Sequence, residues 1–297
     1  MSTVKEKYKD IIEQMMANST KQHTITDENV WQESNKNNLQ LFYQIVDDLM
    51  LPGSSVLHLE NLIDLYRLSQ DGKSCLILME HYSNFDLPCF YRLVEEGHYL
   101  GPQVADSVVA IAGMKLNEES PIVLGFAEAF SRIIIYPSRS LQKIEDPQQL
   151  ETETRKSKMI NLAAMKALGR AKSSGKLILV FPSGTRYRPG RAETKRGVKE
   201  IDSYLKGFDY MVLVGLNGCN LVAADGPMET EVAVQDVIQY TVSPVISCAE
   251  FRDDILSSIP EGVEDPKQYT VDRVMSILDE IHEETEEKRL RLLDKNQ

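Results

Sequence analysis

Four short apolar runs constrain the fold of this chain more than any other feature of its sequence. They cover residues 75–79, 132–136, 177–181 and 211–216, and helical patterns stand between them, the longest over residues 154–174. Runs of this length without polar alternation are typical of strands buried on both faces, as in parallel sheets covered by helices. The sequence therefore predicts an α/β fold with a largely parallel or mixed central sheet flanked by helices.

The two ends of the chain show other patterns. Residues 1–70 carry apolar residues at helical spacing without a strand pattern, and Asp27 is expected to cap a helix that runs towards Pro52. Residues 230–247 are rich in Val and Ile and predict antiparallel or edge strands. Apolar residues at helical spacing over 271–281 predict a terminal amphipathic helix.

The length of the chain supports two structural units, or one large α/β unit with an appendage. It has 297 residues, and a domain takes about 150 residues as a soft prior. We expect an N-terminal helical domain over residues 1–70, packed as a small bundle, followed by an α/β domain over residues 71–297.

Charge and cysteine content exclude several classes of protein. The 33 basic and 45 acidic residues give a net charge of −12, which argues against general nucleic-acid binding. The four cysteines are far apart and form no C-x-x-C pair, so neither a disulfide framework nor a zinc site is expected. No stretch approaches the ~18 consecutive apolar residues that span a bilayer. We expect a soluble cytoplasmic protein, and leave open a mature plastid protein and peripheral membrane contact.

Several familiar catalytic motifs are missing from the sequence. Gly72-Lys73-Ser74 lacks the earlier glycine of a P-loop, because Arg67 stands at that position. The sequence contains neither G-x-G-x-x-G after a predicted strand nor G-x-S-x-G nor H-E-x-x-H. Nicotinamide, nucleotide, metal and serine-hydrolase chemistry are therefore not predicted, and we expect no cofactor and no metal.

A histidine and an aspartate stand at the end of the first apolar run. His81 comes just after residues 75–79, Asp86 follows five residues later, and Pro88 suits the first turn of a helix. A carboxylate that binds one ring nitrogen raises the basicity of the other, as a general base requires. The alternative is structural, with Asp86 as a helix N-cap and His81 as a hydrogen-bonding partner.

A second motif follows the apolar run 177–181. A Pro-Ser-Gly-Thr turn leads into several arginines, and the residues in question are Ser183, Gly184, Thr185, Arg186 and Arg188. Guanidinium groups match phosphate oxygens in a bidentate geometry, so this loop is a candidate phosphate clamp. The basic residues over 191–199 fit a solvated loop or a docking patch for an acidic partner.

Together, the two motifs resemble the glycerophospholipid acyltransferase family, which shows H-x-x-x-x-D after one strand and F-P-[E/S]-G-[T/G]-R after a later one. The resemblance covers residues 75–216. Within this family, the chain is similar to the soluble, stromal-type glycerol-3-phosphate acyltransferases in three features. It has Ser183 in place of Glu, an Arg-x-Arg-Pro sequence after it, and a helical segment ahead of the α/β part.

The chain departs from that family at several positions. The stromal type carries a Lys-His pair where this chain has Arg139 and Ser140, and the Asn that precedes the family's histidine is Glu80 here. Arg139 keeps a positive charge for a phosphate, whereas Ser140 cannot replace a histidine. The strand pattern over 211–216 lacks the family's proline. These differences concern the acceptor more than the acyl-transfer chemistry.

The resemblance implies an enzyme in which His81 takes a proton from an acceptor hydroxyl while Asp86 orients its ring. The implied phosphate and loop residues are Arg139, Ser183, Gly184, Thr185, Arg186 and Arg188. The implied donor is an acyl carrier protein or acyl-coenzyme A, and the implied acceptor is glycerol 3-phosphate, which would give lysophosphatidic acid. Lysophosphatidic acid as the acceptor, or a non-catalytic relative that binds lipid or phosphate, are the alternatives.

Overall fold

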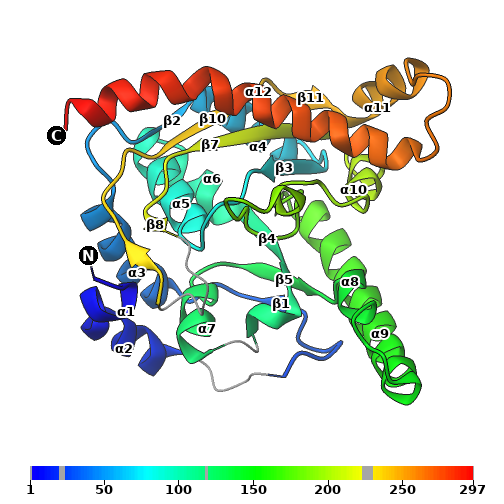
Figure 1. Ribbon diagram of the computed structural model, residues 1–297, viewed down its shortest axis with the longest axis horizontal. Coiled ribbons are helices and arrows are strands. Elements are labelled where there is room, and N and C mark those ends of the chain that lie inside the picture. Colours follow the sequence, from blue (N-terminus) through cyan, green and yellow to red (C-terminus); the bar gives the residue numbers. More distant parts are fainter. Residues whose placement is uncertain (1, 20–23, 118–119, 223–229, 297) are drawn as a thin grey trace.

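A nine-stranded sheet forms the centre of the protein (Figure 1). The computed structural model describes residues 2–19, 24–117, 120–222 and 230–296. The strands of this sheet are β1 (Trp31–Gln32), β2 (Ser55–Leu57), β3 (Cys75–Met79), β4 (Val108–Gly113), β5 (Arg132–Ile135), β6 (Leu177–Val180), β7 (Tyr210–Asn217), β10 (Gln239–Val242) and β11 (Ile246–Ser247). They follow the order β1-β5-β4-β6-β3-β7-β10-β2, and β11 pairs with β7.

The five central strands, from β5 to β7, run parallel to one another. The strands β1, β10 and β11 pair antiparallel with their neighbours, and β2 is parallel to β10. A separate two-stranded antiparallel sheet joins β8 (Leu221–Val222) and β9 (Val232–Ala233). The predicted α/β class with a largely parallel central sheet is confirmed.

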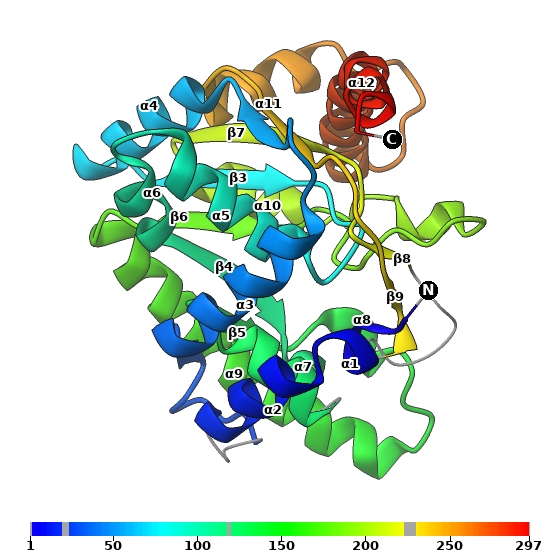
Figure 2. The same cartoon turned by 90° about the vertical axis from the view of Figure 1, so that its left-hand side faces the viewer.

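Helices lie on either side of the sheet (Figures 1 and 2). They are α1 (Val4–Lys7), α2 (Lys9–Asn18), α3 (Lys36–Leu49), α4 (Leu59–Gln70), α5 (Asp86–Gly97), α6 (Gly101–Ser107), α7 (Pro121–Ala127), α8 (Ser138–Leu141), α9 (Pro147–Ser173), α10 (Ile201–Gly207), α11 (Cys248–Ser257) and α12 (Pro266–Asp294). Since successive strand residues point to opposite faces, β3 contributes to two cores. Ile77 packs with residues of α3 and α5, and Leu76 packs with residues of α9 and α12.

The sequence predicts most of the sheet. Its four apolar runs form β3, β5, β6 and β7, and residues 230–247 supply β10 and β11 as expected. The strand β4 is not predicted by the sequence pattern. This strand begins at Val108 directly after α6 ends at Ser107, so no turn residue separates the two elements.

The expectation of an N-terminal segment without strands is wrong. Trp31–Gln32 pairs with β5, and Ser55–Leu57 pairs with β10, so both strands are defined by partners far along the chain. Asp27 does not begin the following helix. The helix α3 begins at Lys36, where the Asn35 side chain accepts hydrogen bonds from the backbone N–H groups of residues 37 and 38 at 3.1 and 3.2 Å.

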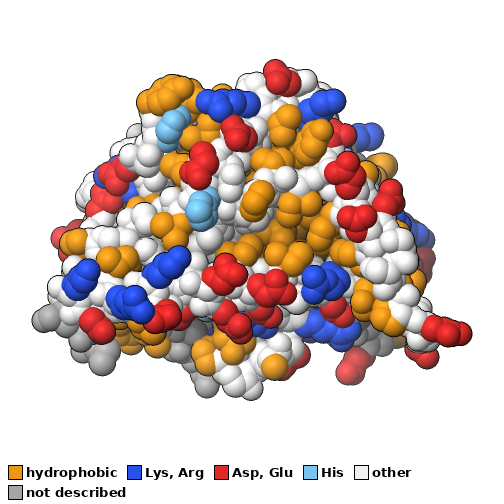
Figure 3. All heavy atoms as spheres, turned by 90° about the horizontal axis from the view of Figure 1, so that it is seen from above, with side chains coloured by type: hydrophobic (Ala, Val, Ile, Leu, Met, Phe, Trp, Pro, Cys, Tyr) orange, Lys and Arg blue, Asp and Glu red, His pale blue; other side chains and the backbone are white. Residues whose placement is uncertain are grey.

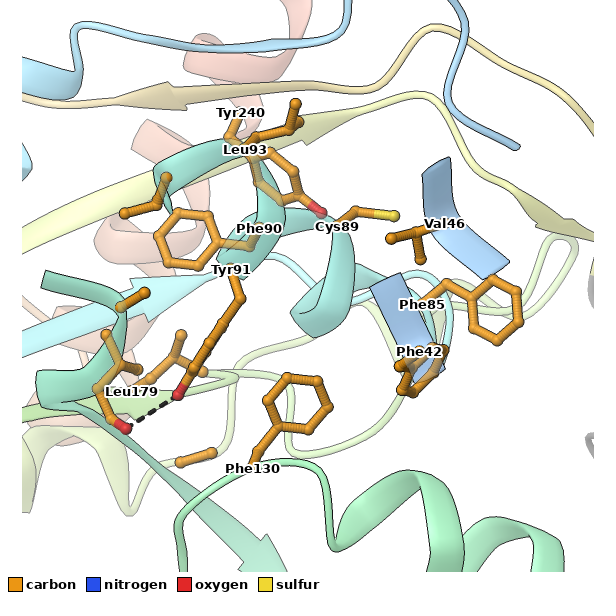
Figure 4. Close-up of a cluster of buried hydrophobic side chains, with 14 of the residues drawn as sticks. Phe42, Val46, Phe85, Cys89, Phe90, Tyr91, Leu93, Phe130, Leu179 and Tyr240 are labelled. Carbon is orange, nitrogen blue, oxygen red and sulfur yellow. Dashed lines mark hydrogen bonds between the residues drawn. The ribbon is translucent and has the colours of Figure 1, made fainter. Parts of the chain in front are cut away.

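The N-terminal helices share a core with the rest of the protein (Figure 4). The Phe42 ring of α3 stacks on Phe126 of α7 at 4.5 Å and meets Phe85 edge-on at 5.3 Å between centroids. Figure 4 shows Phe42 and Val46 of α3 beside Phe85, close to the N-terminus of α5. The boundary at residue 70 stays a prediction, although aromatic packing crosses it.

Two long helices complete the second layer. The helix α9 extends the predicted 154–174 helix at its N-terminal end, because Asp146 caps it with an acceptor for Gln149 N and Pro147 opens it. The predicted terminal helix is α12, and its buried residues Val271, Val274 and Leu278 pack into the core. None of the helices in the described ranges is long and apolar enough to cross a bilayer.

Candidate active site

The two sequence motifs meet at one edge of the sheet. Strands β3 and β6 are parallel neighbours with Leu78 opposite Val180, so the segments that follow them leave the sheet on the same side. The backbone N–H of Tyr187 donates to the carbonyl oxygen of His81 at 2.7 Å. The His81 ring stacks on Phe181, with 3.9 Å between centroids and 15° between planes.

His81 and Asp86 are in direct contact. His81 Nδ1 lies 2.9 Å from Asp86 Oδ2, and the Asp86 side chain is only 3% exposed. The carboxylate also accepts the backbone N–H of Tyr82 at 2.6 Å and of Ser83 at 2.9 and 3.0 Å, together with the Ser83 hydroxyl at 2.7 Å. These donors satisfy both oxygens of the buried carboxylate. In the tautomer that donates Nδ1–H to this carboxylate, His81 Nε2 carries the lone pair.

Contacts of the helix α5 and of Phe181 fix the position of the His81 ring. Asp86 is the first residue of α5, and its carbonyl oxygen accepts the hydroxyl of the buried Tyr240 at 2.6 Å. Tyr240 lies in β10, so a residue late in the chain fixes the start of this helix. Phe181 covers one face of the imidazole. The ring is therefore held by a carboxylate, an aromatic face and a fixed helix terminus.

Glu80, which precedes His81, occupies a buried network. Its side chain is 2% exposed. Its carboxylate accepts the backbone N–H of Leu216 at 2.9 Å and the Tyr82 hydroxyl at 2.7 Å, and it lies 3.1 Å from His282 Nδ1. Glu80 thus joins the end of β3 to β7 and to α12. Asn could not supply a negative charge to these partners.

Two basic side chains, His282 and Lys195, lie beside Glu80. Burial opposes the charged form of His282, but the hydrogen bond and negative charge of Glu80 outweigh it and raise the His282 pKa above its usual value. Lys195 Nζ lies 4.0 Å from Glu80 and 2.5 Å from Asp279. Burial likewise opposes the charge of Lys195, and Asp279 outweighs it, so the pKa of Lys195 is raised.

The second motif forms a tight loop in which Gly184 has a special role. Gly184 adopts a φ of 61°, the left-handed region that favours glycine. A Cβ there would lie 2.8 Å from Arg139 Nη2, which donates to the Gly184 carbonyl oxygen. The Ser183 hydroxyl donates to the carbonyl oxygen of Thr185 at 2.6 Å. Arg139 of α8, predicted from a separate block of the sequence, thus contacts this loop through its side chain.

The remaining arginines of the motif lie in different surroundings. Arg186 Nη1 donates to both oxygens of the fully buried Glu231, at 2.8 and 3.0 Å. Arg188 forms an antiparallel bridge with Arg191, and its backbone N–H donates to the Thr194 hydroxyl at 2.9 Å. Sequence reasoning found the arginines and missed Glu231, which stands outside both motifs.

A cavity of about 430 Å³ lies beside this loop. Its lining comes from residues 187–197 and from α12, and includes Tyr187, Lys195, Arg196, Met275 and Asp279. Tyr187 also packs edge-on against Tyr82, with 5.8 Å between centroids. Lys195, which the sequence assigns to a solvated or docking stretch, therefore lies between this cavity and Glu80.

His81 is the candidate general base of this arrangement, and the nearby Cys89 is poorly suited to act as a nucleophile. Cys89 lies on α5 near Asp86, but it is buried, and burial raises the pKa of its thiol well above the usual value. Within the described ranges, His, Cys, Asp and Glu side chains form no group of three that could hold a metal ion. The geometry fits proton abstraction by His81 from a hydroxyl that attacks a carbonyl carbon.

Sequence reasoning overlooked His282. It lies on α12, where Val271, Val274 and Leu278 mark the buried side, and positions three or four residues further along fall on the same side. A titratable residue on the apolar side of a helix is a signal that could have pointed to a buried partner.

Comparison with known proteins agrees with this geometry. The family model described as Acyltransferase matches residues 57–206, just over half of the 297-residue chain. The match includes both motifs, from the end of β2 to α10. Among curated proteins, none matches the chain.

Proposed function

Because the chain belongs to the acyltransferase family, we propose that it moves a fatty acyl group from an acyl thioester to the sn-1 hydroxyl of glycerol 3-phosphate, giving lysophosphatidic acid. The single observation that carries the proposal is the contact of His81 Nδ1 with the buried Asp86 carboxylate at 2.9 Å. This contact leaves Nε2 as the basic atom of the ring.

In the proposed reaction, His81 Nε2 takes the proton of the acceptor hydroxyl while the hydroxyl oxygen attacks the thioester carbonyl. Asp86 stabilises the imidazolium that forms. Collapse of the tetrahedral intermediate breaks the carbon–sulfur bond, and the thiolate receives the proton from His81. General-base help of this kind contributes roughly 10²- to 10⁴-fold to the rate.

The proposed acceptor site uses the loop that follows β6. Arg139 and Arg188 supply positive charge for the phosphate, and the Gly184 carbonyl oxygen accepts a hydrogen bond from the Arg139 guanidinium. Arg186 contributes as well, since its contacts with Glu231 use Nη1 and a guanidinium carries further donors. A doubly charged phosphate on a small acceptor suits several arginines that close on it. Ser183 and Thr185 shape the loop.

The test is thiol release from acyl-coenzyme A and from acyl carrier protein by the purified chain, with and without glycerol 3-phosphate. We expect release that depends on glycerol 3-phosphate and is lost in His81→Ala. Lysophosphatidic acid in detergent micelles serves as the competing acceptor. Faster acylation of lysophosphatidic acid would reassign the acceptor, and no thiol release with any acceptor would identify a non-catalytic relative.

A further inference from the structure

The middle of the long helix α9 presents three large apolar side chains to solvent. Met159, Leu162 and Met165 expose 54%, 57% and 70% of their surface, and we call them the α9 stripe. A helix advances about 100° per residue, so the stripe lies away from Ile160 and Ala164, which are buried in the core. The helix cannot turn the stripe inward without losing that packing. Apolar side chains gathered on one outer face mark a contact surface.

The charged residues of α9 beside the stripe, from residue 154 to residue 173, are all basic. Arg155, Lys158, Lys166 and Arg170 are exposed, and the sequence from 154 to 173 contains no Asp or Glu. Arg155 pairs with Glu151 at the N-terminal end of the helix, at 2.6 Å. This concentration of positive charge stands out in a chain with a net charge of −12. In contrast, the face seen from above carries acidic and basic side chains side by side (Figure 3).

We propose that the α9 stripe and its flanking basic residues dock the protein onto a bilayer that contains anionic lipids. An interfacial helix binds by placing apolar side chains at the headgroup boundary while Lys and Arg contact the anionic headgroups. The long stems of Lys158 and Lys166 can lie along the apolar layer with their charges in the headgroup region. Both chemical components of such a site are exposed on one rigid helix.

A second copy of the chain fits this surface less well. A symmetric contact places the same surface on both subunits, so Lys158, Lys166 and Arg170 would face basic residues of the partner copy. Like charges brought together in this way oppose association. A bilayer supplies negative charge across the whole contact.

An acidic acyl carrier protein would match the positive charge of this surface, but the surface is not placed where a carrier would have to bind. The helix α9 follows β5 and leads into β6. It therefore runs from the carboxyl ends of the parallel strands, where His81 lies, back towards their amino ends. The stripe and Arg170 lie on its middle and C-terminal parts. A carrier must bring its thioester to His81, whereas a bilayer contact needs no such reach. Figure 1 shows α9 at the margin of the molecule.

The inference does not depend on the proposed function, because vesicle binding is measured without acyl transfer. The full chain is mixed with vesicles of phosphatidylcholine alone, or of equal parts phosphatidylcholine and phosphatidylglycerol, and the bound fraction is separated by flotation. We expect the partition coefficient for the anionic vesicles to exceed that for the neutral vesicles by a factor of about ten or more. The coefficient for the anionic vesicles should fall as salt is added.

Two sets of variants test the surface. Lys158→Glu, Lys166→Glu and Arg170→Glu, combined, should lower the partition coefficient for anionic vesicles about a hundredfold. Met159→Ser, Leu162→Ser and Met165→Ser, combined, should lower it about tenfold. All six positions are exposed, and circular dichroism with thermal unfolding checks that the variants fold.

Matched control variants make the same changes elsewhere. Lys73→Glu, Lys267→Glu and Lys288→Glu reverse three exposed lysines outside α9, and Val222→Ser, Leu256→Ser and Leu290→Ser replace three exposed apolar residues. Both control sets should bind anionic vesicles like the wild type. Equal losses in the controls, or equal binding of the wild type to neutral and anionic vesicles, would overturn the proposal.

Two further readouts assign the surface to another partner if the proposal fails. If the apolar variant changes the oligomeric state on size-exclusion chromatography while vesicle binding is unchanged, the surface binds a second copy. If the charge-reversed variant loses affinity for an acyl carrier protein while vesicle binding is unchanged, the surface binds the carrier. Either result excludes the bilayer as its occupant.

Discussion

Glu80, the residue directly after β3, and His282 of α12 stand 202 residues apart in the chain, yet Glu80 Oε2 lies 3.1 Å from His282 Nδ1. The contact attaches the terminal helix to the residue directly before His81. Because the Glu80 carboxylate also accepts the backbone N–H of Leu216, the end of β3 is held from two sides. The position of the proposed base therefore depends on a helix outside the matched residues 57–206.

His81→Ala should lower kcat by about 10²- to 10⁴-fold, since it removes the general base. Asp86→Asn should also be severe, because an amide can hold the ring but cannot stabilise an imidazolium. Steady-state kinetics with glycerol 3-phosphate measure both effects. His58→Ala, at an exposed position before α4, is the control and should keep wild-type kcat. If His81→Ala keeps most of its activity, His81 is not the base.

The contribution of His282 to stability should depend on pH. Its pKa is raised above 6.5 in the folded state, so its protonated form favours folding. That stabilisation is fully present below about pH 6.5 and is lost as the pH rises through the folded-state pKa. We expect the free energy of unfolding to differ most between the wild type and His282→Gln at low pH, with the difference shrinking above neutrality. Urea unfolding at several pH values measures it, and a constant difference would contradict the prediction.

Gly184→Ala should damage acceptor binding and stability together. The left-handed φ costs an alanine about 1–2 kcal/mol, and the new Cβ would lie 2.8 Å from Arg139 Nη2, which displaces that side chain. Gly190→Ala is the matched control, because Gly190 has a φ of 81° and its added Cβ meets no atom within 4 Å. Both variants should lose similar stability in thermal unfolding, and only Gly184→Ala should raise the KM for glycerol 3-phosphate. An equal rise in KM in the two variants would show that the contact with Arg139 is not needed for acceptor binding.

Arg188→Ala should raise the KM for glycerol 3-phosphate with little change in the KM for the acyl donor. Removal of one partner of a desolvated charge pair costs about 2–5 kcal/mol, which sets the upper range of the effect. Arg67→Ala removes an exposed arginine that pairs with Asp64 on α4 and should leave both constants unchanged. The same rise in KM for both substrates would mean that Arg188 maintains the structure of the loop and does not bind the phosphate.

The sequence predicts those parts of the fold whose physical cause is local. Residues 75–79 form β3 because an apolar run of that length is buried on both faces, and α12 follows from its own helical spacing. The strands β1 and β2 have two and three residues, too few for a pattern, and they exist because β5 and β10 offer hydrogen-bonding edges.

The same distinction applies to the candidate site. His81 and Asp86 are five residues apart, so a short turn brings them together, and the sequence contains that information. Glu231 beside Arg186 and His282 beside Glu80 are brought in by distant elements. Residue type and spacing carry no record of such partners before the topology is known.

The aromatic core that the N-terminal helices share with the rest of the protein limits how the chain can be truncated. Removal of residues 1–70 would delete β2 and leave β10 with an open hydrogen-bonding edge, which promotes association between sheets. It would also remove Phe42 and uncover Phe85, the residue just before Asp86. A fragment that begins at residue 71 is therefore expected to aggregate on expression, and chemistry carried by α5 requires the N-terminal helices to be present.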